Sequence, residues 1–264
     1  VYEDFGWTSE DSSFGCRNSG QSDMAGECGG TDPGPEPGEP TPISEIQGDG
    51  DVSPLRGQTV TIEGIVVGDY EGPSPALRGF YVQEEESDWD DDPATSEGIF
   101  VFNFDNDSVS VGDLVSVTGT VDEFQGQTQL GFPDELEVLS SGNEVAATEV
   151  TLPVPDPDHL ERYEGMLVTF PQDLYVTEFF QLGRFGQVVV SSGDRLQQPT
   201  AVAEPGAEAQ AVQAANDLNR LILDDTTNAQ NPDPIVFGRG GEPLTAANTL
   251  RGGDTVTGAT AGVA

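Results

Sequence analysis

The chain of 264 residues carries 48 acidic side chains and nine basic ones, all arginines, which gives a formal net charge of −39. Such a chain repels itself at low ionic strength, whereas about 1 M salt shortens the Debye length to about 3 Å and screens the repulsion. The composition therefore favours a protein of a halophilic or marine organism over simple acidic drift. It also excludes a nucleic-acid-binding surface built on abundant lysine and arginine.

The apolar residues, 35% of the chain, occur in short runs of about strand length. No run approaches the about 20 apolar residues of a membrane-spanning helix, so no membrane partner is expected. The first residue is Val1, and no basic segment followed by an apolar one opens the sequence. A secretion signal is therefore expected to be missing or already removed.

Cys16 and Cys28 lie in an acidic segment rich in Gly and Ser. A disulfide between them would close a small loop, stabilise it by about 3 kcal/mol and imply an oxidising, extracellular setting. Two free or metal-binding thiols are the alternative, although no Cys-x-x-Cys pair or nearby His supports zinc. We interpret residues 1–30 as the disulfide-bridged end of an upstream domain. Residues 31–42, with alternating Pro and acidic residues, are interpreted as an extended linker.

Residues 43–150 show the two-residue alternation of half-buried strands. Five strands are predicted between turn residues, at 59–63, 79–83, 98–102, 111–121 and 125–130. Five short strands at this spacing fit the five-stranded Greek-key OB barrel. The sequence therefore predicts a first OB-like barrel over residues 43–150.

The same order of motifs recurs in residues 151–264. Segments 165–169, 187–190, 221–223 and 253–256 echo the first four predicted strands. Apolar spacing after Pro205 predicts a helix at 205–218. A duplicated β module explains the recurrence, and chance alignment of generic strands is the alternative. The predicted fold is therefore mainly all-β, with two tandem OB-like five-stranded barrels, of which the second contains one helix. Because nothing echoes the strand at 125–130, the second barrel is expected to be cut short at its C-terminus.

The sequence offers no catalytic constellation. The one histidine, His159, could act as a catalytic base, but the sequence contains no Gly-x-Ser-x-Gly nucleophile elbow. No phosphate-binding loop or zinc-protease motif occurs either. No cofactor is expected in the chain itself, with Ca²⁺ as the one candidate. Asp88, Asp90 and Asp92 have the 1-3-5 spacing of a calcium loop, and Glu97 follows. Pro93 in place of the turn glycine excludes an EF-hand, which leaves a looser Ca²⁺ site or a solvated loop.

Four landmarks in order resemble the region before the catalytic domain in extracellular nucleases of the ExeM/NucH type. They are ISEIQG at 43–48 with SPLRGQTV at 53–60, DPATSEGIFV at 92–101, LERYEGMLV at 160–168, and QAANDL at 213–218 followed by LDD and QNPDP. The resemblance implies a secreted DNase of the endonuclease/exonuclease/phosphatase superfamily. In that family the catalytic domain, with Mg²⁺ or Mn²⁺, lies C-terminal to this region. Its motifs do not occur here, so no catalytic residue is carried over.

Two functional hypotheses remain open. In the first, the chain is an accessory region of the DNase that positions the C-terminal nuclease domain and weakly binds extracellular DNA. OB barrels bind single strands by stacking bases on aromatic side chains and by pairing cations with phosphates. The candidate DNA contacts are four aromatic residues and one arginine, and the aromatic residues could instead fill the barrel. These five residues are Tyr81, Phe179, Phe180, Arg184 and Phe185. In the second, the chain is an extracellular OB-type module for polysaccharide or calcium-bridged ligands, without nuclease context.

Overall fold

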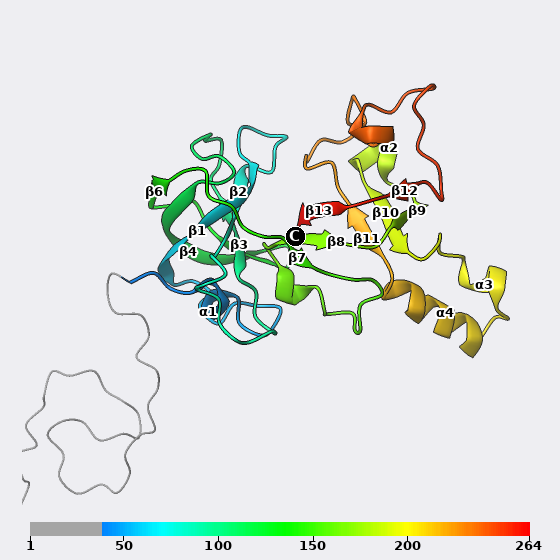
Figure 1. Ribbon diagram of the computed structural model, residues 1–264, viewed down its shortest axis with the longest axis horizontal. Helices are drawn as coiled ribbons and strands as arrows, with labels where there is room; N and C mark the ends of the chain where they lie inside the picture. The colour runs from blue at the N-terminus through cyan, green and yellow to red at the C-terminus, as the bar shows by residue number, and fades with distance from the viewer. Residues whose placement is uncertain (1–38) are drawn as a thin grey trace, which may run out of the picture. The chain divides into compact units, whose positions relative to one another are not determined.

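The computed structural model describes residues 39–264 (Figure 1). The predicted disulfide between Cys16 and Cys28, the upstream domain end and most of the linker lie outside the described residues. Pro40–Ala264 form one unit, and its secondary structure is mainly β, as predicted. Among the described helices, none is both long and apolar enough to cross a membrane.

The first half of this unit (residues 40–147) is built on a ring of strands. Its elements are α1 (Ile43–Gln47), β1 (Thr59–Tyr70), β2 (Gly79–Gln83), β3 (Gly98–Phe102), β4 (Leu114–Phe124), β5 (Gln127–Leu130) and β6 (Glu135–Ser140). β1 pairs antiparallel with both β2 and β4, β2 pairs with β3, and β5 joins β3 in parallel and β4 antiparallel. These five strands close on themselves, and β6 adds to β4 outside the ring.

The ring encloses an apolar core because its strands alternate. Val115, Val117 and Val121 of β4 are buried, while Ser116, Thr118 and Thr120 between them are more exposed. Ile43 and Ile46 of α1 are fully buried in the same cluster, so the helix covers the core. All five predicted strands are present; β2 and β3 have the predicted bounds, and β1 is longer than predicted.

The second half (residues 148–264) forms two sheets. Its elements are β7 (Thr148–Glu149), η1 (Glu161–Tyr163), β8 (Leu167–Phe170), β9 (Leu174–Glu178), α2 (Leu182–Phe185), β10 (Val188–Ser192), α3 (Pro199–Val202), α4 (Ala207–Asp217), β11 (Leu221–Leu223), η2 (Arg239–Gly241), β12 (Thr255–Val256) and β13 (Ala259–Gly262). The sheet orders are β11-β10-β9-β12 and β13-β8-β7. A second buried cluster lies between these elements.

The second half differs from a closed five-strand ring in a defined way. β12 and β13 run antiparallel along β9 and β8, with Thr255 opposite Tyr175 and Gly262 opposite Leu167. The β12–β9 and β13–β8 pairings form a ladder in two pieces, whereas the ladder between β1 and β4 in the first half is continuous. The four predicted strand segments each overlap an observed strand, and α4 lies within the predicted helix. β9 and β13 were not predicted.

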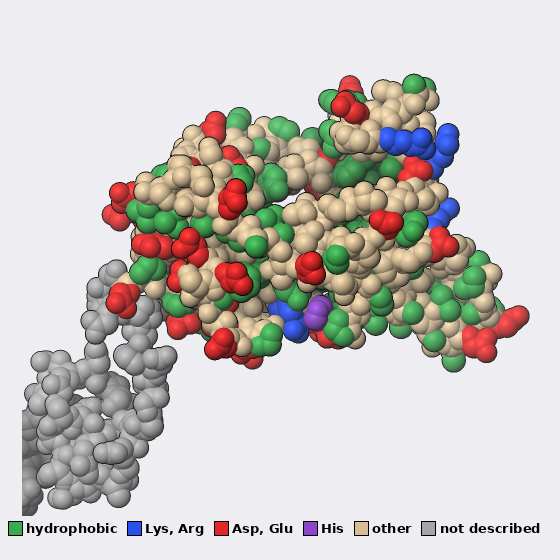
Figure 2. All heavy atoms as spheres, in the orientation of Figure 1, with side chains coloured by type: hydrophobic (Ala, Val, Ile, Leu, Met, Phe, Trp, Pro, Cys, Tyr) green, Lys and Arg blue, Asp and Glu red, His purple; other side chains and the backbone are tan. Residues whose placement is uncertain are grey.

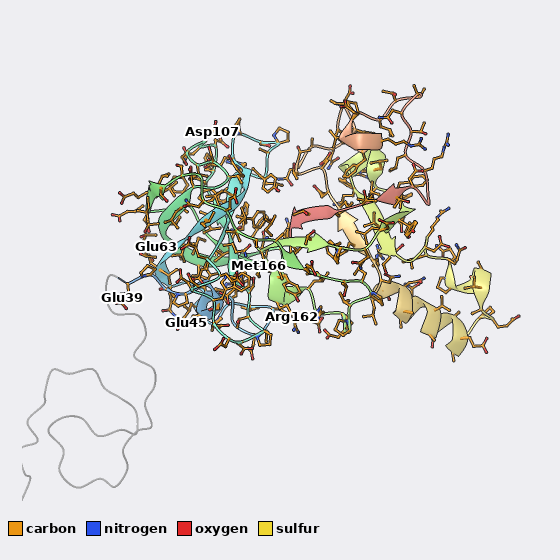
Figure 3. All side chains as sticks on the ribbon, viewed as in Figure 1. Glu39, Glu45, Glu63, Asp107, Arg162 and Met166 are labelled. Atoms are coloured by element: carbon orange, nitrogen blue, oxygen red, sulfur yellow. The ribbon has the colours of Figure 1, made fainter. Side chains whose placement is uncertain are left out.

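The two halves touch through close backbone contacts. A Cβ atom on Gly98 would lie 2.3 Å from the carbonyl carbon of Gly165, so only glycine fits there. Nearby, the Ser96 hydroxyl donates to the Glu164 carbonyl oxygen over 2.6 Å, and the Leu167 N–H donates to Gln83 Oε1 over 2.8 Å. Met166, labelled in Figure 3, marks this seam.

Candidate functional site

The groove that we consider the candidate site lies on the second half, beside the end of β9. It has a volume of about 720 Å³. Four parts of the chain line it: the end of β9 with the residues after it, Val189 of β10, the 195–201 segment, and the last turns of α4 with the residues that follow. The residues that line the groove include Phe179, Phe180, Arg195, Gln213, Asn216 and Arg220.

Phe179 and Phe180 form the aromatic wall of the groove, and the short helix α2 holds them in place. They lie between the end of β9 at Glu178 and the N-cap of α2 at Gln181. Leu182 of α2 is buried in the second core, which anchors the helix and leaves the preceding residues outside. Phe180 is 82% exposed and Phe179 46% exposed. An aromatic ring this exposed offers a face on which a planar ligand group can stack.

Two arginines supply positive charge in the groove. The Nε–H of Arg195 donates to the Thr177 carbonyl oxygen over 3.3 Å, which holds its guanidinium at the end of β9. Arg220 follows α4. In the described part of the chain, only Arg56, Arg78 and Arg239 have a carboxylate oxygen within 4.0 Å. Arg195 and Arg220 therefore keep guanidinium N–H groups for an outside acceptor, and a planar guanidinium fits phosphate or carboxylate.

Amide side chains complete the groove. Asn216 donates to the Gln197 carbonyl oxygen over 3.0 Å, which links α4 to the 195–201 segment. Gln213 donates to Asp217 Oδ1 over 2.7 Å, so this carboxylate is engaged within the helix. In Figure 2 the blue side chains of this face lie mainly on the second half, while red side chains are spread over both. The groove combines exposed rings, guanidinium groups and amides with one further carboxylate, that of Glu178. The rings and the two guanidinium groups are suited to an anionic ligand with planar groups.

The structure divides the five predicted contact residues between two places. Phe179 and Phe180 lie in the groove, whereas Phe185 lines a different one together with Tyr81. The Arg184 guanidinium carbon lies 4.9 Å from the centre of the Phe185 ring. Tyr81 is only 4% exposed and packs against Phe100 at 4.9 Å between ring centres, and burial raises its pKa to about 12. Tyr81 is therefore a core residue in this structure.

The predicted calcium residues lie in the loop between β2 and β3. Asp90 Oδ1 accepts the Asp92 N–H over 2.8 Å, and Asp92 Oδ1 accepts the Ala94 N–H over 2.9 Å. Glu97 Oε1 accepts the Asp90 N–H over 3.2 Å. Among the described residues, Asp88, Asp90, Asp92 and Glu97 do not meet as one ligand cluster. Asp90 and Asp92 instead act as acceptors that shape the loop.

A different group of carboxylates does meet, and no sequence motif marks it. Asp69, Glu71 and Asp107 come within 4.8 Å of one another, with Asp107 labelled in Figure 3. Glu71 Oε2 accepts the N–H groups of Ser108 and Val109 over 2.6 and 3.0 Å. Burial, followed by the charge of Glu71, raises the pKa of Asp69. Because Glu71 is saturated by these donors, it serves as a clamp for the loop after β3.

His159 lies in the loop before η1. Its Nδ1 atom is 4.0 Å from Asp156 Oδ2, and its ring meets Tyr163 edge-on at 5.9 Å between centres. Burial lowers the pKa of His159. Its contacts are those of a packing residue.

Sequence reasoning missed Arg195, Arg220, Gln213 and Asn216. No local motif marks them, because β9, the 195–201 segment and α4 come together only in the folded chain.

Comparisons with known proteins add little to this geometry. Neither a protein-family model nor a curated protein sequence matches the chain. Several solved structures are similar, including that of the OBody AM1L10 bound to hen egg-white lysozyme. It is 20% identical, with 33% of this chain and 84% of that chain covered, at a TM-score of 0.23. A likeness this weak carries no argument about function.

Proposed function

We propose that this chain is a non-catalytic accessory region of a secreted, metal-dependent DNase, and that its groove contacts single-stranded DNA. The observation that carries the proposal is the juxtaposition of Phe180 with Arg195 and Arg220. Base stacking on an aromatic ring contributes about 1–3 kcal/mol per base and is tolerant of sequence. The resemblance of residues 43–264 to the ExeM/NucH type supports the nuclease context.

We also propose that the first half is an OB-type barrel. Its support is the closed strand order β1-β2-β3-β5-β4 with a parallel β3–β5 pair, which fits a five-stranded Greek-key barrel. The second half is proposed as an incomplete version, with β8–β9 in the place of β1 and β12–β13 in the place of β4. β10 and β11 then correspond to β2 and β3.

The net charge sets how strongly the groove binds DNA. Two arginines that contact phosphates give a salt slope of only about −1.4, at about −0.7 per phosphate for single strands. The charge of −39 repels DNA at low salt, and that repulsion weakens as salt rises. Affinity is therefore weak and nearly independent of salt, which suits a positioning role beside a separate nuclease domain.

The proposal is tested by fluorescence anisotropy of a labelled oligo-dT with the whole chain at low salt and at about 2 M salt. Phe180→Ala is expected to weaken binding at least about fivefold, since a stacking partner is lost. Phe124→Ala, which removes an aromatic side chain 58% exposed on the first half, is the matched control and leaves binding unchanged. Equal loss in both variants, or DNA cleavage by the chain with Mg²⁺, contradicts the proposal.

The second candidate function, a module for polysaccharide, is supported by the amides of Gln213 and Asn216 in the same groove. OB barrels also bind oligosaccharides through such groups. Competition of a neutral oligosaccharide against oligo-dT tests this candidate: displacement of the DNA at rising sugar concentration shows a shared groove, and comparison of the two Kd values shows which ligand the groove prefers.

A further inference from the structure

Two buried glutamates face each other where β2 and β3 begin to separate. The Glu84 N–H donates to the Glu97 carbonyl oxygen over 3.0 Å, which extends the β2–β3 ladder by one pair. Glu84 is 7% exposed and Glu97 4% exposed. Their carboxyl groups lie within hydrogen-bonding reach of each other. Two acidic groups are thus held together inside the protein by backbone pairing.

One oxygen of each carboxyl group is used and the other is not. Glu84 Oε1 accepts the Ile43 N–H at the start of α1 over 2.9 Å, and Glu97 Oε1 accepts the Asp90 N–H. The buried Oε2 atoms of both residues have no protein donor among the described residues. Burial raises the pKa of both groups, and the hydrogen bond and charge of Glu84 raise that of Glu97 further. Such a pair needs a proton or a cation between its members.

The surroundings favour a cation. The carboxylates of Asp88 and Asp90 act electrostatically on Glu84, and the loop between the two glutamates carries no basic residue. No salt bridge joins either glutamate to a basic side chain of the described chain. Calcium accepts six to eight oxygen ligands in flexible geometry, including carboxylates and water, whereas Mg²⁺ demands a near-ideal octahedron. Two carboxyl groups at the base of a loop of irregular shape fit Ca²⁺ better.

We infer that Glu84 and Glu97 bind one calcium ion between their two Oε2 atoms, with water completing its coordination. This ligand set differs from the one that the 1-3-5 spacing suggests, because Asp90 and Asp92 are both engaged in the turn and Glu84 is added. The ion joins β2, β3 and the start of α1, so it fixes the acidic loop on the first half. The inference is independent of the proposed DNA contact.

Trp89 makes the site measurable with terbium, a luminescent substitute for calcium. Its indole N–H donates to the Glu84 carbonyl oxygen over 3.0 Å, so the ring lies next to the site and sensitises the metal. With the whole chain in high salt, we expect terbium emission that Ca²⁺ displaces. The double variant E84Q/E97Q keeps the side-chain shape and is expected to bind about tenfold more weakly or worse. Glu86→Gln, an exposed acid of the same loop, leaves binding unchanged.

Three controls make the result decisive. Trp89→Phe removes the sensitised emission but keeps the rise in Tm with Ca²⁺, which separates the site from any signal of Trp7. Asp107→Asn leaves the emission intact, which excludes the cluster at Asp69 and Glu71. If E84Q/E97Q loses its circular dichroism spectrum, the single variant E97Q replaces it. Emission that survives E97Q, or a Tm that Ca²⁺ leaves unchanged at every pH as for a shared proton, overturns the inference.

Discussion

Glu164 is the single residue through which the two halves exchange the most side-chain hydrogen bonds. Its Oε1 accepts the Thr128 N–H over 2.8 Å and the Gln47 amide over 3.4 Å. Its carbonyl oxygen accepts the Ser96 hydroxyl. The side chain is buried, and burial raises its pKa to about 7. A carboxyl group in this position therefore makes the contact between the halves sensitive to pH.

The sign of this effect follows from proton linkage. Between about pH 4.5 and pH 7 the folded state holds the Glu164 proton while the unfolded state has released it, so unfolding becomes easier as pH rises. In the protein with Glu164, the free energy of unfolding is expected to fall by at most about 3 kcal/mol across this window. We expect Glu164→Gln, which keeps the acceptor oxygen, to abolish this fall. Urea unfolding at several pH values measures it. Glu63→Gln, at an exposed acid, is the control, and an equal reduction of the fall in that variant contradicts the prediction.

At the scale of elements, the approach of β3 to the segment before β8 depends on two glycines. Gly165 has φ +76°, and a Cβ there would lie 2.5 Å from the Gly98 carbonyl carbon. The neighbouring atoms are backbone, so they have little freedom to move aside. The sequence placed Gly98 and Gly165 only as the first residues of predicted strand segments. It did not predict the contact, because the contact joins segments far apart in the chain.

Gly98→Ala is therefore expected to destabilise the fold by about 1–3 kcal/mol or more, as overpacked contacts do. Urea unfolding at constant salt gives the free energy. Gly50→Ala is the matched control, since nothing lies within 4 Å of its added methyl group. If the two variants unfold at the same urea concentration, the close contact of the halves does not contribute to stability.

For the whole molecule, charge outweighs any single contact. Acidic residues outnumber arginines 48 to nine, and three arginine–carboxylate pairs occur among the described residues. Each exposed pair contributes at most about 1 kcal/mol, so pairing does not offset the repulsion. Figure 2 shows the red side chains dispersed over the visible face rather than gathered at one site. Screening by salt is the remaining way to reduce the self-repulsion.

The Tm of the whole chain is expected to rise steadily as NaCl increases from about 0.1 M to about 2 M, because the Debye length shortens from about 10 Å to below 3 Å. Scanning calorimetry measures the rise. Sucrose at matched osmolality is the control for solvent exclusion, and it should raise the Tm less. A Tm that falls with salt means that attractive pairs, and not repulsion, dominate the electrostatics.

The sequence by itself determined five of the six strands of the first half and α4, because burial on one face leaves a local period in the residues. Val115, Val117 and Val121 show that period, whereas β6 was missed because five of its six residues are exposed. β13 has only small and polar residues, so its pattern carries no hydrophobic signal. Composition alone also established the acidity and hence the expected dependence on salt.

Only the tertiary structure decided where the functional candidates lie. Phe180, Arg195 and Arg220 share a groove because β9, the 195–201 segment and α4 pack together. Glu84 and Glu97 face each other because β2 and β3 pair in one register, and a different register would separate them. Local periodicity reports which residues are buried, whereas the meeting of distant residues depends on strand pairing and packing, which no short stretch of sequence encodes.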